Sequence, residues 1–236
     1  MKKYFYCLIL FIVVINPVVA QKDSLKVESS GNKTFLSKQI LPLSLITAGS
    51  LLNIGTVKNK IEDQIPNTNT HIENYMQYTG MAEIYLFDAM GFRHQNSVFD
   101  QTKYLAISQL ITSTVVTVLK RTTRVARPYG ARSSFPSGHT TMAFTGATAL
   151  FQEFKNTDPL IACSGFAFST ATGFLRLTNR AHWLPDVMVG AGIGILTVDL
   201  VYHFKPLKNF QPFKKKNNVS IIPEISPESL GFVCRF

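Results

Sequence analysis

The sequence Phe135-Pro136-Ser137-Gly138-His139, followed by the apolar stretch 140–151, predicts the start of a helix that can bind an anion. Pro and Ser are favoured where helices begin, and Gly lets a ligand approach the backbone closely. The first backbone N–H groups of a helix have no partner within it, so they can bind phosphate. His139 would then donate a proton to a leaving oxygen. Taken alone, the same five residues also fit an ordinary capped helix start.

A basic stretch precedes this helix start. From position 120 to 139 the chain carries five Lys or Arg residues and no Asp or Glu; the basic residues are Lys120, Arg121, Arg124, Arg127 and Arg132. A basic run by itself is typical of a solvated loop. Because this one lies between two apolar segments and beside a predicted anion site, we interpret it as a source of phosphate ligands.

A third group of polar residues follows the apolar segment 160–175, and it comprises Arg176, His182 and Asp186. A His and an Asp four residues apart lie on one face of a helix. The carboxylate can then accept from one imidazole nitrogen and leave the other as a nucleophile. Arg176 supplies a planar fork suited to phosphate oxygens. Without the other motifs, a structural His/Asp pair is the more common interpretation.

The three groups together resemble the signature of the type 2 phosphatidic acid phosphatase superfamily. That signature reads Lys-x6-Arg-Pro, then Pro-Ser-Gly-His, then Ser-Arg-x5-His-x3-Asp. Its positions correspond here to Lys120 with Arg127-Pro128, to Pro136-Ser137-Gly138-His139, and to Arg176, His182 and Asp186. There are two departures: Leu175 replaces the Ser of the third motif, and only residues 129–135 separate the first two motifs. Neither departure removes a catalytic group.

The resemblance implies a metal-independent phosphatase that needs no cofactor. In this scheme His182 attacks phosphorus, Asp186 orients the His182 imidazole, and His139 protonates the leaving alkoxide. Water then hydrolyses the phospho-histidine. The residues implied to hold the phosphate oxygens are Lys120, Arg127, Ser137, Gly138 and Arg176.

The composition favours a membrane protein. Apolar residues make up 46% of the chain and charged residues 16%, whereas a soluble domain typically carries about 25% charged residues. Five apolar segments are near the lower length limit for a membrane span: 40–57, 104–119, 140–151, 160–175 and 187–202. A weaker segment, 81–92, carries Glu83 and Asp88, so we expect a buried or interfacial helix there.

Small residues recur every four positions in two of these segments. They are Gly165, Ser169 and Gly173 in one, and Gly190 and Gly194 in the other. This spacing lets helices pack closely in lipid. The sequence therefore predicts an all-α transmembrane helical bundle with the superfamily core and about five to six membrane helices. A soluble helical bundle is the alternative.

The remaining segments define the predicted domain organisation. Residues 1–20 have the layout of a signal peptide or signal anchor. A polar segment, 21–39, leads into the phosphatase helical domain, 40–204, and a basic tail, 205–236, is expected to form a small hairpin or to be disordered. The three cysteines form no CxxC or Cys/His cluster, so the sequence supports neither a disulfide framework nor a metal site.

The function that best fits these features is removal of phosphate from a membrane lipid, either a phosphomonoester or a pyrophosphate. Lipid A, undecaprenyl pyrophosphate and phosphatidylglycerol phosphate represent the expected substrate class, and the sequence does not distinguish among them. The expected location is the bacterial inner membrane, with the active site on the periplasmic face and no nucleic-acid partner.

Three alternatives stay open at this stage. A soluble periplasmic acid phosphatase of the same superfamily would have the same motifs, and a vanadium haloperoxidase would share the pocket. A basic protein that binds membranes or nucleic acid without turnover would not need the His/Asp/His set.

Overall fold

The computed structural model describes residues 37–53, 57–204, 220–226 and 229–235, together with residues 35, 206, 207 and 210. The chain divides into two compact units, Met1–Tyr202 and His203–Phe236. The predicted signal segment, 1–20, lies outside the described residues.

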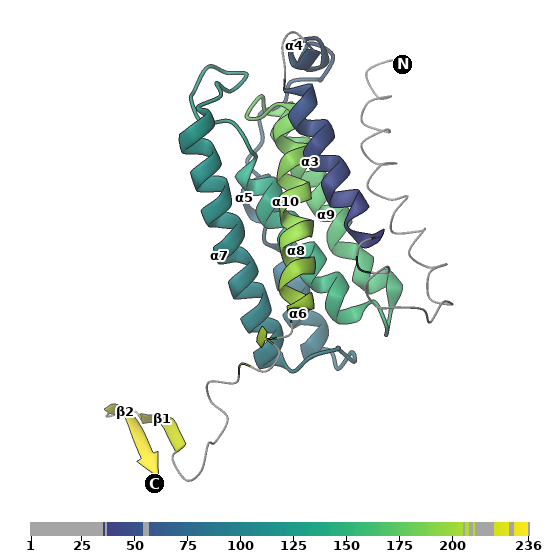
Figure 1. Ribbon diagram of the computed structural model, residues 1–236. Helices are drawn as coiled ribbons and strands as arrows, with labels where there is room; N and C mark the ends of the chain where they lie inside the picture. Colours follow the sequence, from purple (N-terminus) through teal and green to yellow (C-terminus); the bar gives the residue numbers. More distant parts are fainter. Residues whose placement is uncertain are drawn as a thin grey trace. The chain divides into compact units, whose positions relative to one another are not determined.

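The described part of the first unit is all-helical, which confirms the predicted fold class (Figure 1). Its helices are α3 (Ile40–Leu52), α4 (Val57–Glu62), α5 (Glu73–Met76), α6 (Thr79–Ala89), α7 (Val98–Thr123), α8 (Gly138–Phe154), α9 (Pro159–Thr178) and α10 (Leu184–His203). Each of the five predicted apolar segments lies largely within one helix. The long helices run side by side as a bundle, and α8 packs against α6, α7 and α9.

Local capping determines where two of the long helices begin. Ser97 caps α7 by accepting a hydrogen bond from the Asp100 backbone N–H. The Asp158 carboxylate caps α9 by accepting from the N–H groups of Leu160 and Ile161, and Pro159 occupies the first position of the helix. These side chains satisfy N–H groups that have no partner inside a helix.

The small residues of α9 and α10 let these helices approach the backbone of α8. A Cβ added at Gly165 would lie 3.0 Å from the Ala147 Cα. A Cβ at Gly190 would lie 2.8 Å from the Ser137 carbonyl oxygen. Real Cβ atoms are rarely this close to other heavy atoms, so larger side chains would push the helices apart. The predicted role of these glycines in close helix packing is confirmed.

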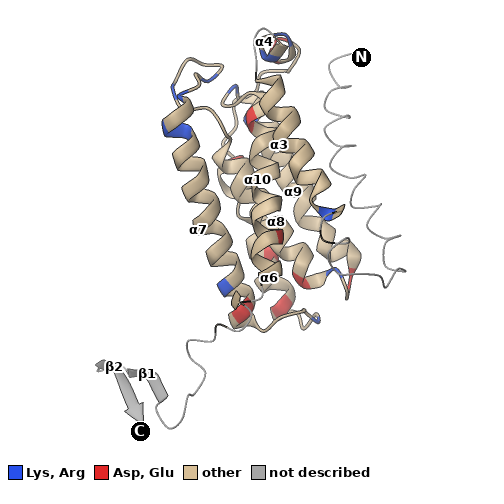
Figure 2. Ribbon diagram, in the orientation of Figure 1, with Lys and Arg blue, Asp and Glu red and all other residues tan. Residues whose placement is uncertain are grey.

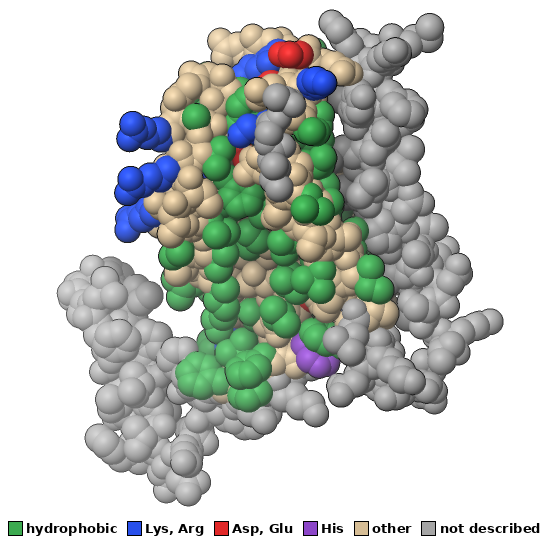
Figure 3. Space-filling view, turned by 45° about the horizontal axis from the view of Figure 1, so that its top comes forward, with side chains coloured by type: hydrophobic (Ala, Val, Ile, Leu, Met, Phe, Trp, Pro, Cys, Tyr) green, Lys and Arg blue, Asp and Glu red, His purple; other side chains and the backbone are tan. Residues whose placement is uncertain are grey.

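The bundle has the apolar helices of a membrane protein. Among the described residues, α7, α9 and α10 are long and apolar enough to cross a membrane, and α3 is apolar but shorter. Figure 2 shows that charged residues lie mainly toward the ends of the long helices. Apolar side chains cover much of the face in Figure 3, with Lys and Arg gathered toward one end. The total of five to six membrane helices stays a prediction.

The weaker segment 81–92 corresponds largely to α6. Ile84 and Glu83 of this helix are buried, and the helix packs against α8 and α9. Tyr85 and Leu86 of the same helix are exposed, so only one face is buried, and the expectation of a buried or interfacial helix stays a prediction.

The second unit contains a two-stranded antiparallel hairpin. Strand β1 (Ser220–Ser226) pairs with β2 (Ser229–Arg235), so that Ser220 is opposite Arg235 and Ser226 is opposite Ser229. A hairpin was one of the two structures expected for the tail.

Candidate active site

The three motifs meet at one end of the bundle, where α7 ends and where α8 and α10 begin. Lys120 donates from Nζ to the backbone carbonyls of Ser133 at 2.9 Å and Ser134 at 3.1 Å. The Ser137 backbone N–H donates to the Asp186 carbonyl at 3.0 Å. The first contact ties the Lys motif to the loop before α8, and the second ties the start of α8 to the start of α10.

His182 and Asp186 form a buried pair. The His182 Nδ1 lies 3.4 Å from the Asp186 Oδ2, and the two side chains are 2% and 0% exposed. Oδ2 also accepts from the Trp183 backbone N–H at 3.0 Å and from the Ser134 hydroxyl. Burial lowers the pKa of His182 to about 4, although Asp186 acts in the opposite direction. The imidazole is therefore neutral at pH 7, and its Nε2 has no hydrogen-bond partner among the described residues.

Two arginines bring unpaired donors to this end of the bundle. Arg127 donates from Nη1 to the Tyr129 hydroxyl at 2.7 Å, and Arg176 donates from Nη1 to the Glu73 Oε1 at 3.1 Å. The Nε atoms of both arginines are buried and have no partner in the described part of the chain. A buried donor without a partner costs about 1–3 kcal/mol. Such donors suit an acceptor-rich ligand such as phosphate.

The start of α8 leaves room at its glycine. A Cβ at Gly138 would come no closer than 3.7 Å to Val116 and 4.0 Å to Lys120, which are ordinary contacts. Helix packing therefore does not demand glycine at this position, unlike Gly190. Ser137 precedes the helix, and its hydroxyl is 2.9 Å from that of Thr140.

A family model described as the PAP2 superfamily matches residues 101–210, a range that contains all three motifs. The matched range is slightly less than half of the chain, and it supports the resemblance seen in the motifs. Only the part of the chain from α7 to just beyond α10 is included in this match.

Two known proteins are similar to part of this chain. A lipid A 1-phosphatase from Porphyromonas gingivalis is 40% identical over 82 residues, which are 34% of this chain and 18% of that protein. The match therefore covers less than a fifth of the curated relative's length. The crystal structure of Aquifex aeolicus LpxE is 25% identical, with a TM-score of 0.46, over 56% of this chain and 84% of that chain.

Three residues that contact the PAP2 motifs were not predicted from the sequence. Glu73 pairs with Arg176, Asn74 accepts from His139 Nε2 at 2.9 Å, and Ser134 donates to Asp186. Glu73 and Asn74 belong to a polar stretch of mixed charge that shows no motif. They lie far from their partners in the sequence, so no local spacing pattern could have linked them.

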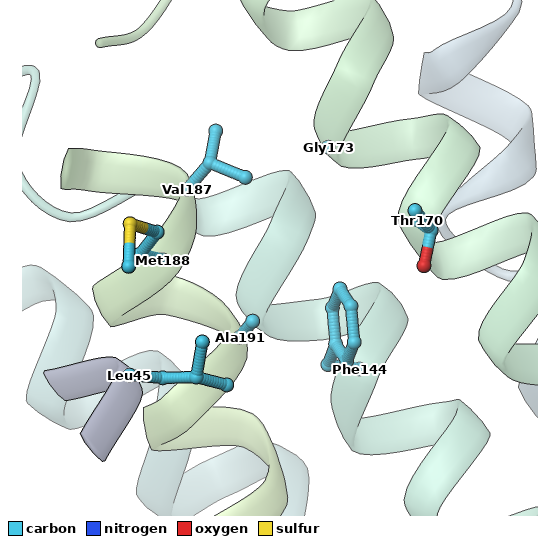
Figure 4. Close-up of a pocket in the computed structure, with 7 residues that line it drawn as sticks. All are labelled: Leu45, Phe144, Thr170, Gly173, Val187, Met188 and Ala191. Carbon is cyan, nitrogen blue, oxygen red and sulfur yellow. The ribbon is translucent and has the colours of Figure 1, made fainter. Parts of the chain in front are cut away.

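Within the described residues, no group of three or more His, Cys, Asp or Glu side chains is placed to hold a metal ion. A separate small apolar pocket lies between α3, α8, α9 and α10 (Figure 4). Its lining residues are Leu45, Phe144, Thr170, Gly173, Val187, Met188 and Ala191. None of the eight predicted site residues lines this pocket, although Val187 directly follows Asp186 in the chain.

Proposed function

We propose that this protein is a phosphatase that removes phosphate from a membrane lipid through a phospho-histidine intermediate. The main support is the buried His182–Asp186 pair, whose imidazole is neutral and has Nε2 free of hydrogen bonds within the described residues. The charges of Lys120 and Arg176 both act on His182. A neutral nucleophile close to cations is the arrangement that phosphoryl transfer to histidine requires.

The proposed reaction has two steps. In the first, His182 Nε2 attacks phosphorus, a P–N bond forms, and the bond to the leaving oxygen breaks as His139 donates its proton to that oxygen. In the second, water attacks the phospho-histidine and gives a proton to His139. The P–N bond then breaks, inorganic phosphate leaves, and both histidines return to their starting states. Asp186 holds Nδ1 of the nucleophile throughout.

The charge that develops on the phosphate oxygens needs donors fixed in advance. In this proposal Lys120, Arg127 and Arg176 supply the positive charge, and the Ser137 hydroxyl and Gly138 backbone N–H supply further hydrogen bonds. The partnerless Nε atoms of the two arginines support this assignment. In many other phosphoryl-transfer sites metal ions neutralise this charge. We therefore propose a metal-independent reaction without a cofactor.

A lipid substrate is supported by two observations. Three described helices are long and apolar enough to span a membrane, and the curated relative is named a lipid A 1-phosphatase. We propose a phosphomonoester or pyrophosphate of a membrane lipid as substrate, of the class of lipid A, undecaprenyl pyrophosphate or phosphatidylglycerol phosphate. We further propose the bacterial inner membrane as location, with the site on the periplasmic face.

The alternative is a soluble periplasmic acid phosphatase of the same superfamily. The apolar surfaces of α7 and α9 favour the membrane enzyme, because most of the apolar stretch of each helix is not buried inside the bundle. Extraction separates the two proposals: the membrane enzyme requires detergent, and the soluble enzyme does not.

The direct test is phosphate release by the detergent-purified full chain across a panel of these phosphorylated lipids. We expect turnover of at least one lipid, and a loss of several orders of magnitude in the His182→Ala variant. Absence of release from every lipid and from an aryl phosphate would contradict the proposed function.

A further inference from the structure

The segment that begins α5 contacts two of the proposed site residues from outside the three motifs. Glu73 and Asn74 are neighbours in the chain, and they bind Arg176 and His139 respectively. We propose that both are positioning residues, with Glu73 orienting the guanidinium of Arg176 and Asn74 orienting the imidazole of His139. This inference rests on the proposed phosphatase function.

Glu73 holds one edge of the Arg176 guanidinium. Its side chain is 2% exposed, and its Oε1 accepts from Arg176 Nη1 at 3.1 Å and from Asn179 Nδ2 at 2.8 Å. With Nη1 taken, the buried Nε of Arg176 still has no partner among the described residues. Glu73 thus fixes the plane of the Arg176 guanidinium and leaves another N–H donor of Arg176 for a phosphate oxygen.

Asn74 holds one nitrogen of the His139 ring. Its Oδ1 lies 2.9 Å from His139 Nε2, and an amide oxygen can only accept a hydrogen bond. Nε2 therefore carries a hydrogen, and Nδ1 can donate a proton to a leaving oxygen only when the ring is protonated on both nitrogens. Burial lowers the pKa of free His139 to about 4, so in this proposal the imidazolium forms beside the bound phosphate, whose negative charge favours it. Without Asn74 the ring would be free to turn away from that oxygen.

An ion pair earlier in the chain, at the end of α4, contacts no motif residue and serves as a matched control. Glu62 at the end of α4 lies 3.2 Å from Arg180, with side chains 5% and 31% exposed. Arg180 also donates to the Ile65 carbonyl at 3.3 Å. This pair anchors the end of α4 to the chain just beyond α9. The Glu62→Gln variant therefore tests anchoring separately from positioning.

The leaving group provides a readout that a purely structural role would not affect. Asn74 is exposed, so Asn74→Ala should fold. We expect its kcat to fall by about 10- to 100-fold on a lipid phosphate and by less than about twofold on an activated aryl phosphate, whose leaving oxygen needs little protonation. His139→Ala should show the same pattern, and the double variant should be no slower than His139→Ala alone. Asn74→Asp should restore turnover, because its carboxylate also accepts from Nε2.

Glu73→Gln should act on phosphate binding. We expect the KM for the aryl phosphate to rise and inhibition by vanadate to weaken, each by about tenfold, as expected for loss of one charge-assisted contact. Glu62→Gln should leave both quantities close to those of the unmodified protein.

Either of two results would overturn the proposal. In the first, Asn74→Ala lowers kcat equally on the lipid phosphate and the aryl phosphate. In the second, Glu62→Gln changes the KM and the vanadate inhibition as much as Glu73→Gln does. Each result would mean that the segment that begins α5 only anchors the bundle. If the unmodified protein releases no phosphate at all, the proposed function itself fails. If it turns over normally while the variants act uniformly, only the positioning roles fail.

Discussion

The backbone N–H of Ser137 donates to the backbone carbonyl of Asp186 at 3.0 Å. This bond joins the first residues of α8 and α10, so the Pro-Ser-Gly-His motif and the His/Asp pair are held together by main-chain atoms. Gly190, one turn further along α10, makes this possible, because an added Cβ would lie 2.8 Å from the Ser137 carbonyl oxygen. The geometry of the site therefore depends on a helix contact outside the motifs.

Replacing Gly190 with Ala should separate the two helix starts. We expect a loss of about 1–3 kcal/mol in stability from overpacking, together with a clear fall in phosphate release. Gly194→Ala is the matched control, since its Cβ would lie 2.8 Å from the Thr141 carbonyl oxygen, deeper in the bundle. Thermal unfolding in detergent and kcat/KM should be measured for both variants. If Gly190→Ala and Gly194→Ala lose the same stability and the same activity, the Gly190 contact has no specific role in the site.

Replacing Ser134 with Ala should weaken the support of Asp186. The buried Ser134 hydroxyl donates to the Asp186 Oδ2. Loss of a hydrogen bond to a charged group is worth about 1.5–3 kcal/mol, so we expect kcat to fall by roughly 10- to 100-fold. Ser133→Ala is the control, because the site uses only the Ser133 carbonyl. Unchanged turnover in Ser134→Ala would show that the hydroxyl does not support the reaction.

Chelation should leave the activity intact. The proposed site provides a nucleophile, an acid and three cations, so EDTA should not reduce phosphate release. Vanadate should inhibit, because it adopts the five-coordinate geometry of the transferring phosphoryl group. Inhibition curves measured with and without EDTA test both statements. Loss of activity on chelation that a divalent ion restores would contradict a metal-independent reaction.

The two ends of the α8–α9 pair should be labelled from opposite sides of the membrane. Tyr129 is 56% exposed near the site, and Asn156 is exposed in the turn between α8 and α9. In a cysteine-free background, we expect Tyr129→Cys to react with an impermeant thiol reagent from the periplasm and Asn156→Cys to react only from the cytoplasm. The reverse pattern would place the active site on the cytoplasmic face.

Much of the bundle could be predicted because apolar segments and helix-start residues are local signals. The Pro-Ser-Gly-His sequence predicted the start of α8, which begins at Gly138. The predicted apolar segment 104–119 is shorter than α7, because Ser97 caps the helix start at Val98 and the polar residues 100–103 belong to its first turns. Helix starts outside the apolar stretches depend on side-chain hydrogen bonds that hydropathy does not reveal.

The candidate site was predictable only where its residues follow fixed spacings. His182 and Asp186 are four residues apart, so their contact follows from helix geometry. Glu73 lies 103 residues from Arg176 in the chain. Its burial depends on how the segment before α6 folds over the end of α9, and this tertiary contact leaves no periodic trace in the sequence.

The covalent intermediate provides the most direct test of the proposed mechanism. The full chain would be mixed with a radiolabelled phosphate substrate, quenched in alkali within one turnover, and digested for mass spectrometry under alkaline conditions that preserve phospho-histidine. The proposal predicts phosphate on His182 in the unmodified protein and none in His182→Ala. Phosphate on another residue, or normal turnover by His182→Ala, would contradict it.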